Sequence, residues 1–151
     1  MNLKNLIGSG DKIGLFSLPI VVIGLIMNFL MPSFFGVGGP AKELFIVSII
    51  VLIPGVVIWI WCIILIATKV SNHQLITGGP YAVVKHPLYT NAALLVLPWI
   101  GFIFNSWLGV VIGIVVYSGS RIYSTEEEKH LSKIFGKAWE DYTRKVMLPW
   151  L

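Results

Sequence analysis

Charged residues are scarce in this sequence: Asp, Glu, Lys and Arg together make up 12% of its 151 residues. In a typical soluble domain the charged fraction is about 25%. By contrast, 56% of the residues are hydrophobic, and they fall in long blocks rather than in the stripes of an amphipathic helix. These features exclude an ordinary soluble domain and indicate an integral membrane protein.

Cysteines and clusters of metal-ligating residues are nearly missing as well. Cys62 is the one cysteine, so no internal disulfide can form, and no Cys/His cluster predicts a metal site. No glycine-rich turn of the dinucleotide-binding kind follows a predicted strand. The net charge of +4 is better explained by membrane topology than by nucleic acid, so we expect no nucleic-acid partner.

Long uncharged runs predict the membrane-crossing helices. The runs 15–35 and 44–67 each reach the roughly 20 residues that cross a bilayer, and a membrane helix tolerates a proline such as Pro54. Two shorter runs, 88–104 and 107–123, flank Asn105-Ser106 and predict a tight helical hairpin. No small-residue cleavage site follows the first run, so we expect it to be retained. The sequence therefore predicts one domain over 1–151, an all-α integral membrane protein with four transmembrane helices and a C-terminal cytoplasmic amphipathic helix.

Two glycines in the fourth run have the spacing of a helix-packing motif. Gly109 and Gly113 lie four residues apart, and small residues at that spacing let helix backbones approach closely. We expect them to serve packing within the bundle rather than dimerisation.

The basic residues predict the topology, because Lys and Arg near the ends of spans mark the cytoplasmic side. Lys4 and Lys12 precede the first run, and Lys69 and Lys85 lie between the second and third. Only Lys42 lies on the opposite side. The other six lie at or beyond the end of the fourth run: Arg121, Lys129, Lys133, Lys137, Arg144 and Lys145. With ten of eleven basic residues in agreement, both termini are predicted to be cytoplasmic.

The connection 68–87 is unusually long, and long connections are often functional. It contains Gly78-Gly79-Pro80-Tyr81, a turn signal, and then Lys85-His86-Pro87-Leu88-Tyr89. Pro87 suits the first turn of a helix, so the third span is expected to start there, with His86 at the membrane surface. The plain alternative is a turn with a lysine anchor and interfacial tyrosines.

The C-terminal tail carries an apolar stripe with an acid inside it. At about 100° per residue, Glu128 falls within the stripe, Glu127 at its edge and Glu126 on the opposite side, if the helix continues through Gly136. A buried acid is costly without a partner or a ligand, and pairing with Arg121 is the plain alternative to a ligand. The stripe consists of Leu131, Phe135, Trp139, Tyr142 and Val146.

Together these segments resemble the isoprenylcysteine carboxyl methyltransferase and phospholipid methyltransferase superfamily. The resemblance begins at Leu75, covers about half of the chain, and rests on an ordered set of motifs. These are Gly79-Pro80-Tyr81, His86-Pro87-Leu88-Tyr89, Glu127-Glu128-Lys129-His130-Leu131, Phe135-Gly136, Trp139, Tyr142 and Val146.

The resemblance implies a site for S-adenosyl-L-methionine enclosed by segments 75–91 and 121–146. It assigns catalytic roles to Arg121 and Glu128. The cofactor-binding residues that it implies are Gly79, Pro80, Tyr81, His86, Tyr89, Glu127 and Glu128. Three positions depart from the family pattern. Lys85 replaces an arginine, which keeps the charge but loses bidentate geometry, Asn91 replaces a common glycine, and Arg121 lies two residues further from the acids than expected.

The implied function is methyl transfer to a membrane-associated acceptor, such as the carboxylate of a prenylated cysteine, which Arg121 would orient. Phospholipid (ethanolamine) N-methylation is the alternative within methyltransferases, with His86 or a glutamate as the base. Outside the methyltransferases, the sequence is also compatible with a membrane reductase or a non-enzymatic membrane scaffold. The expected partners are a lipidic or prenylated acceptor and membrane lipids, and no obligate protein partner is evident.

Overall fold

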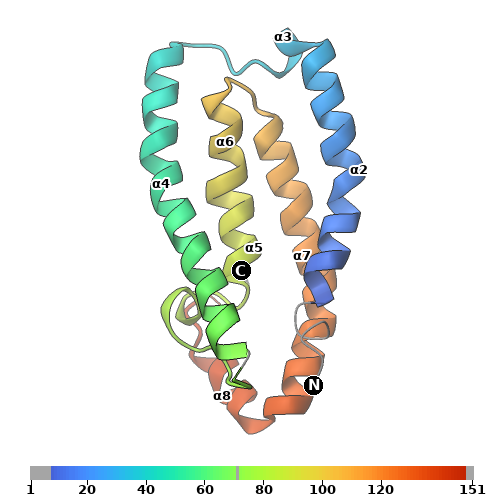
Figure 1. Ribbon diagram of the computed structural model, residues 1–151, viewed down its shortest axis with the longest axis vertical. Coiled ribbons are helices and arrows are strands. Elements are labelled where there is room, and N and C mark those ends of the chain that lie inside the picture. The colour runs from blue at the N-terminus through green and yellow to red at the C-terminus, as the bar shows by residue number, and fades with distance from the viewer. Residues whose placement is uncertain (1–7, 71, 149–151) are drawn as a thin grey trace.

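The computed structural model describes residues 8–70 and 72–148, and the predicted cytoplasmic Lys4 lies outside them. The described chain is almost entirely helical (Figure 1). Its long elements are α2 (Gly8–Leu30), α4 (Ala41–Leu65) and α7 (Leu108–Phe135). Three helices in this part of the chain are long and apolar enough to cross a membrane, and the apolar helical segment Pro87–Ile103 is shorter. The all-helical class is confirmed and is compatible with a membrane protein, whereas the count of four spans stays a prediction because the third predicted run forms a shorter helix.

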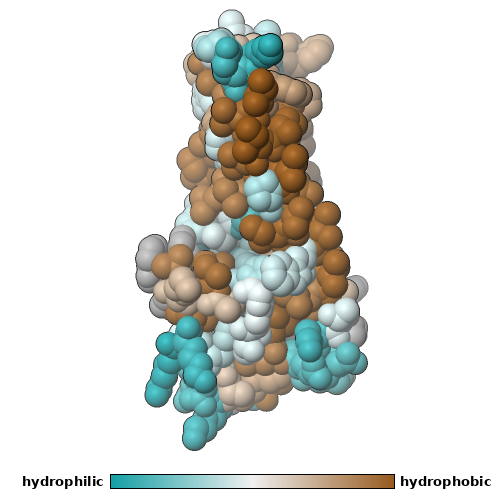
Figure 2. All heavy atoms as spheres, turned by 90° about the vertical axis from the view of Figure 1, so that its left-hand side faces the viewer, coloured by the Kyte–Doolittle hydropathy of each residue, from teal (hydrophilic) through white to brown (hydrophobic). Residues whose placement is uncertain are grey.

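The helices lie side by side in the order α4, α6, α7, α2 (Figure 1). Here α6 (Leu97–Ile103) packs between α4 and α7, and α7 packs along α2. The outward sides of α2 and α4 expose large apolar side chains such as Phe29, Ile50 and Val57. Figure 2 shows this apolar surface along the α4 side, with hydrophilic side chains at its two ends. Exposure of such an apolar surface to water is unfavourable in free energy, whereas lipid chains are as apolar as the surface and can cover it.

The segment Pro87–Ile103 is a helix with an irregular middle. Helix α5 (Pro87–Asn91) begins at Pro87, as the sequence predicts, and a π-helical segment (Ala92–Val96) joins it to α6. Pro98 has no N–H group and so cannot donate the hydrogen bond that a regular helix would form back to residue 94, which accounts for the irregular turn beside it. The Asn91 side-chain amide donates a 2.7 Å hydrogen bond to the Gly55 carbonyl of α4. This bond ties the irregular helix to its neighbour.

The connection between α2 and α4 and the connection between α6 and α7, both at the upper end of Figure 1, are joined by hydrogen bonds. The predicted turn is present, with Asn105 at φ 53°. The Trp107 N–H donates to the Phe35 carbonyl at 3.0 Å, and the Val37 N–H donates to the Asn105 carbonyl at 3.2 Å. Because backbone N–H and C=O groups of the two connections pair with each other, this end joins the pair α2 and α4 to the pair α6 and α7.

Gly109 and Gly113 lie where two helix backbones meet. A Cβ atom on Gly109 would lie 2.2 Å from the Leu97 carbonyl oxygen, and one on Gly113 would lie 2.3 Å from that of Ala93. Neither distance is tolerable for a real side-chain carbon. The prediction that this pair serves packing within the bundle is therefore confirmed.

The observed helix ends differ most from the predicted runs at α2 and α7, and α2 begins at Gly8 rather than at Leu15. α2 ends at Leu30, and Pro32–Phe35 form a separate short helix, α3. α7 continues without a break from the predicted fourth span to Phe135. It then ends at Gly136, where φ is 49°, and α8 (Lys137–Lys145) follows. The tail is therefore not one continuous helix, as the stripe had assumed, because Gly136 turns the chain.

Candidate functional site

The connection after α4 and the C-terminal tail are joined by backbone hydrogen bonds. The Leu148 N–H donates to the Val83 carbonyl at 2.8 Å, and the Met147 N–H donates to the Ala82 carbonyl at 3.2 Å. The Tyr142 hydroxyl donates to the Tyr81 carbonyl at 2.8 Å. Two segments that are about sixty residues apart in the sequence thus form one structural unit at the basic end.

The predicted apolar stripe converges, although it runs over two helices. Trp139, Tyr142 and Val146 form a buried cluster against which Leu131 and Phe135 pack, together with Leu75 of the connection. The turn at Gly136 brings α8 back toward the connection. The apolar side of α8 therefore faces protein, whereas an amphipathic helix lying on the membrane would place it in lipid.

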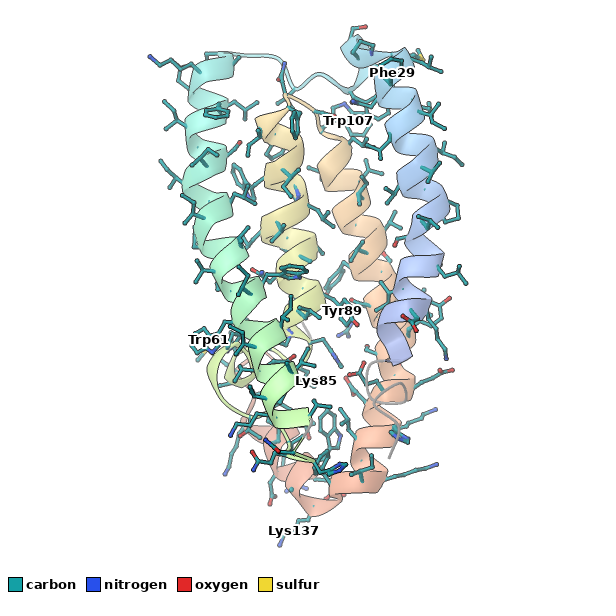
Figure 3. The ribbon with its side chains drawn as sticks, viewed as in Figure 1. Phe29, Trp61, Lys85, Tyr89, Trp107 and Lys137 are labelled. Atoms are coloured by element: carbon teal, nitrogen blue, oxygen red, sulfur yellow. The ribbon has the colours of Figure 1, made fainter. Side chains whose placement is uncertain are left out.

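A cavity lies between this unit and the ends of α4 and α5. It encloses about 740 Å³ of space between atoms, with the open solvent at its mouth included. Figure 3 shows Lys85 and Tyr89 in the space between the lower parts of α4 and α7. The lining residues are Ile66, Val70, Gln74, Leu75, Ile76, Tyr81, Lys85, His86, Leu88, Tyr89, Glu127, Leu131, Phe135, Trp139 and Tyr142.

One oxygen of Glu128 binds two basic side chains. Lys85 Nζ donates to Glu128 Oε1 at 2.7 Å, and His86 Nε2 lies 3.0 Å from the same atom. Lys85 and His86 are 14% and 9% exposed at their side chains, and Glu128 is 28% exposed. Burial by itself raises the pKa of Glu128, but the hydrogen bonds from His86 and Lys85 outweigh it and lower that pKa to about 2. Glu128 lies beyond the predicted fourth span and is an ionised, paired acid.

The three consecutive glutamates face different surroundings. The sequence predicts Glu128 inside the apolar stripe and Glu127 at its edge, whereas in the structure Glu127 lines the cavity together with the stripe residues Leu131 and Phe135. Glu126 is exposed and forms an ion pair with Lys12 of α2. Glu127 lines the cavity, and Glu128 binds Lys85 and His86. Glu128 is therefore paired with residues of the connection rather than with Arg121, the partner that the plain alternative predicted.

The structure brings together five of the sequence-predicted site residues and separates the others. Tyr81, His86, Tyr89 and Glu127 line the cavity, and Glu128 holds His86. Arg121 is exposed and does not line the cavity, and Gly79 and Pro80 line a different hollow. Sequence reasoning treated Lys85 as an anchor and missed Ile66, Val70 and Gln74. The charge retained at the position of the family's arginine was the one signal that pointed to Lys85.

The half-buried Tyr81 and the buried Tyr142 add protonated hydroxyls to the site. Burial raises the pKa of Tyr81 and, together with the charge of Glu128, also that of Tyr142. Both hydroxyls are therefore protonated at neutral pH, as is required of the Tyr142 group that donates to the Tyr81 carbonyl.

An apolar groove lies on the other side of the segment 86–91, which also borders the cavity. Pro87, Thr90 and Asn91 line the groove, whereas His86, Leu88 and Tyr89 of the same segment line the cavity. In Figure 3 the groove residue Trp61 lies on the outer side of α4. The groove is open, encloses about 1000 Å³ and is lined by Ile58, Trp61, Gly79, Pro80, Val83, Val84, Pro87, Thr90, Asn91, Leu94 and Leu95.

The segment that matches known proteins includes most of the residues that line the cavity. Residues 44–138 match the sequence model of the phospholipid methyltransferase family, which is more than half of the chain. Protein-S-isoprenylcysteine O-methyltransferases of Mus musculus and Rattus norvegicus are each 32% identical over 78 residues, which make up 52% of this chain and 28% of each relative. The match thus spans about a quarter of the length of these relatives. No solved structure matches. The chain belongs to the phospholipid methyltransferase family.

Proposed function

We propose that this chain binds S-adenosyl-L-methionine in the cavity at its basic end and transfers the methyl group to a lipidic acceptor. The supporting observation is a cavity lined by side chains of both charges, most of whose lining lies within the segment that matches the family. Within it, Tyr81, His86, Tyr89 and Glu127 are the cofactor-binding residues that we propose. Gly79 and Pro80 shape the turn that places Tyr81.

The chemistry of the lining fits this cofactor. Glu127 offers an anionic acceptor for an ammonium group or ribose hydroxyls, and Lys85 offers a cationic donor for a carboxylate. Phe135 and Trp139 provide aromatic surface for a purine, and Tyr81 and Tyr89 provide ring faces suited to a sulfonium. A cavity of this mixed character suits a charged nucleoside better than a purely apolar ligand.

The membrane arrangement that we propose has four crossings, with Pro87–Ile103 as the third. The described basic residues other than Lys42 lie at or near the end that carries α8, and by the positive-inside rule this end faces the cytoplasm. Both termini then lie on the cytoplasmic side, and the whole chain acts as one domain. The cavity opens at the membrane surface, where a soluble cofactor and a lipid-borne acceptor can meet.

The acceptor that we propose is the carboxylate of a prenylated cysteine or a similar lipid. Its apolar chain would lie in the groove beside Leu94 and Leu95, which is lined almost entirely by apolar side chains and adjoins the cavity. The relatives' names support this acceptor class.

Bound S-adenosyl-L-methionine supplies an electrophilic methyl group on its sulfonium. Direct displacement would transfer this methyl group to the acceptor oxygen, with the electron pair of the broken carbon–sulfur bond remaining on sulfur. A carboxylate is already ionised and needs no base, so the residues of the site bind, orient and exclude water. The enclosing α8 and the aromatic lining serve the last of these roles.

The orienting role of Arg121 stays a prediction. Because its side chain is exposed outside the cavity, it would have to act at the approach of the acceptor. An Arg121→Ala enzyme is expected to show a raised KM for a carboxylate acceptor. Unchanged turnover and unchanged acceptor KM would exclude this role.

Calorimetric binding of S-adenosyl-L-methionine to the detergent-purified protein tests the proposal. The parent should bind, and a folded Glu127→Ala, Glu128→Ala double variant should not. Transfer of a labelled methyl group to a prenylcysteine analogue then tests the acceptor. A well-folded parent that binds no cofactor would overturn the proposal and favour a reductase or a scaffold.

Phospholipid (ethanolamine) N-methylation is the second candidate, and the matched family supports it. An amine acceptor must lose a proton, and His86 in the cavity wall is the base that we propose for this case. Labelled methyl transfer to phosphatidylethanolamine, with none to the prenylcysteine analogue, would select this acceptor.

A further inference from the structure

Glu128 contacts the two basic residues of the cavity lining but is not part of that lining. Among the described residues, Lys85, His86 and Glu127 line the cavity, and Glu128 does not. Its Oε1 atom is nevertheless the shared partner of Lys85 and His86, at 2.7 and 3.0 Å. The adjacent acids thus differ in position: Glu127 lines the cavity, whereas Glu128 contacts two basic residues of its lining.

The contact to Glu128 leaves most of the lysine's bonding capacity available. An ammonium group has three N–H donors, and the contact with Glu128 uses one of them. A free lysine side chain also loses about 2 kcal/mol of rotamer entropy when it is fixed. A lysine already held by a partly buried carboxylate has lost much of that freedom before a ligand arrives, which favours binding.

We propose that Lys85 is the residue that binds a ligand carboxylate in this cavity, and that Glu128 is a positioning residue that holds Lys85 and His86 in place. This inference rests on the proposed function and deepens it. It assigns direct contact with the cofactor's ammonium or hydroxyls to Glu127 alone. It also explains how lysine can replace the family's arginine, because one anchored point charge retains donors for a ligand carboxylate.

The experiment compares two ligands that differ in the carboxylate alone. Binding of S-adenosyl-L-methionine and of its decarboxylated form is measured calorimetrically for the parent, Lys85→Met, Glu128→Gln and the double variant. Lys85→Met should weaken the first ligand about tenfold more than the second, since a hydrogen bond to a charged group is lost. Lys85→Arg, which keeps the charge, should restore most of that difference.

Non-additivity identifies the positioning role of Glu128. If Glu128 acts through Lys85, Glu128→Gln lowers the same selectivity ratio in the parent but adds little to it in Lys85→Met. If Glu128 contacts the cofactor's ammonium, both ligands weaken equally, and this result would overturn the assignment. Glu126→Gln is the matched control, because it makes the same chemical change on the neighbouring exposed residue and should leave the ratio unchanged.

The remaining outcomes are also decisive. If the carboxylate belongs to the acceptor, Lys85→Met leaves the ratio unchanged but raises the acceptor KM about tenfold, and Glu128→Gln raises it through the same residue. No effect on either quantity overturns the inference, whereas failure of the parent to bind the cofactor overturns the proposed function instead. Should Glu128→Gln not fold, Glu128→Asp, which draws the carboxylate back by one methylene, takes its place in the cycle.

Discussion

At the scale of single residues, three consecutive glutamates differ because a helix turns by about 100° per residue. Glu126 points to solvent and Lys12, Glu127 borders the cavity, and Glu128 meets Lys85 and His86. Exposed ion pairs contribute little to stability, whereas a partly buried acid without its partners is costly. The three glutamates are therefore expected to contribute differently to the free energy of unfolding.

The ion pairs of Glu128 predict a pH-dependent stability. Its folded pKa of about 2 lies below the ordinary value of 4.5, so its contribution is complete above about pH 4.5 and is lost as the pH falls toward 2. Glu128→Gln should lower stability by about 1–3 kcal/mol at pH 6, and by progressively less between pH 4.5 and 3. Thermal unfolding in detergent at several pH values measures this difference.

The exposed Glu140 of α8 provides the control for this experiment. Glu140→Gln should shift the unfolding temperature little at any of these pH values. A Glu128→Gln effect that is as large at pH 3 as at pH 6 would contradict the assigned ion pairs.

At the scale of elements, the site depends on helices that stop or bend at particular residues. Pro87 begins α5 directly after His86, and Gly136 ends α7 with a positive φ and turns α8 toward the connection. A helix that continued through Gly136 would carry Trp139 and Tyr142 away from Leu75. These two breaks therefore bring together residues that line the cavity.

Because α7 packs closely against the segment Pro87–Ile103, alanine at Gly113 is expected to affect stability more than alanine at Gly14. A Cβ on Gly113 would lie 2.3 Å from the Ala93 carbonyl oxygen, while one on Gly14 of α2 would meet nothing within 4 Å. Gly113→Ala should therefore destabilise the fold by about 1–3 kcal/mol. Gly14→Ala makes the same chemical change and should be neutral or slightly stabilising. Unfolding temperatures in detergent test this, and equal effects of the two variants would contradict the close packing.

At the scale of the whole molecule, polar chemistry gathers at one end of an apolar bundle. The upper connections bind each other and fix the spacing of the helices, while the lower end carries the cavity, α8 and most of the charge. The apolar groove runs from this end along α4 and α5. A lipid-borne acceptor and a soluble cofactor can thus approach opposite sides of one segment.

Filling the groove should separate acceptor binding from cofactor binding. Leu94 lines the groove and is exposed, so Leu94→Trp is expected to raise the KM for a lipidic acceptor severalfold without changing cofactor affinity. Ile114→Trp, at an exposed apolar position of α7 outside the groove, is the matched control. Kinetics with a prenylcysteine analogue, beside calorimetry with S-adenosyl-L-methionine, measure both quantities. Equal acceptor KM values for the two variants would exclude the groove as the acceptor site.

The sequence by itself determined the all-helical class with its apolar spans, the basic end, the helix start at Pro87 and the greater exposure of Glu126 than of Glu127 and Glu128. Hydropathy, charge and helical periodicity are local properties, and each can be read from neighbouring residues. The resemblance also located the segments that form the site, but its set mixed Tyr81 and Glu127, which line the cavity, with Gly79 and Arg121, which do not.

Only the tertiary structure decided which of these residues meet. Lys85 and Glu128 are 43 positions apart, and no local pattern states that Lys85 and His86 share one carboxylate oxygen of Glu128. The close approach at Gly113 depends in the same way on where two backbones cross. Such contacts are set by side-chain packing and by the need to pair buried charges, and these forces act between segments that the order of the sequence does not relate.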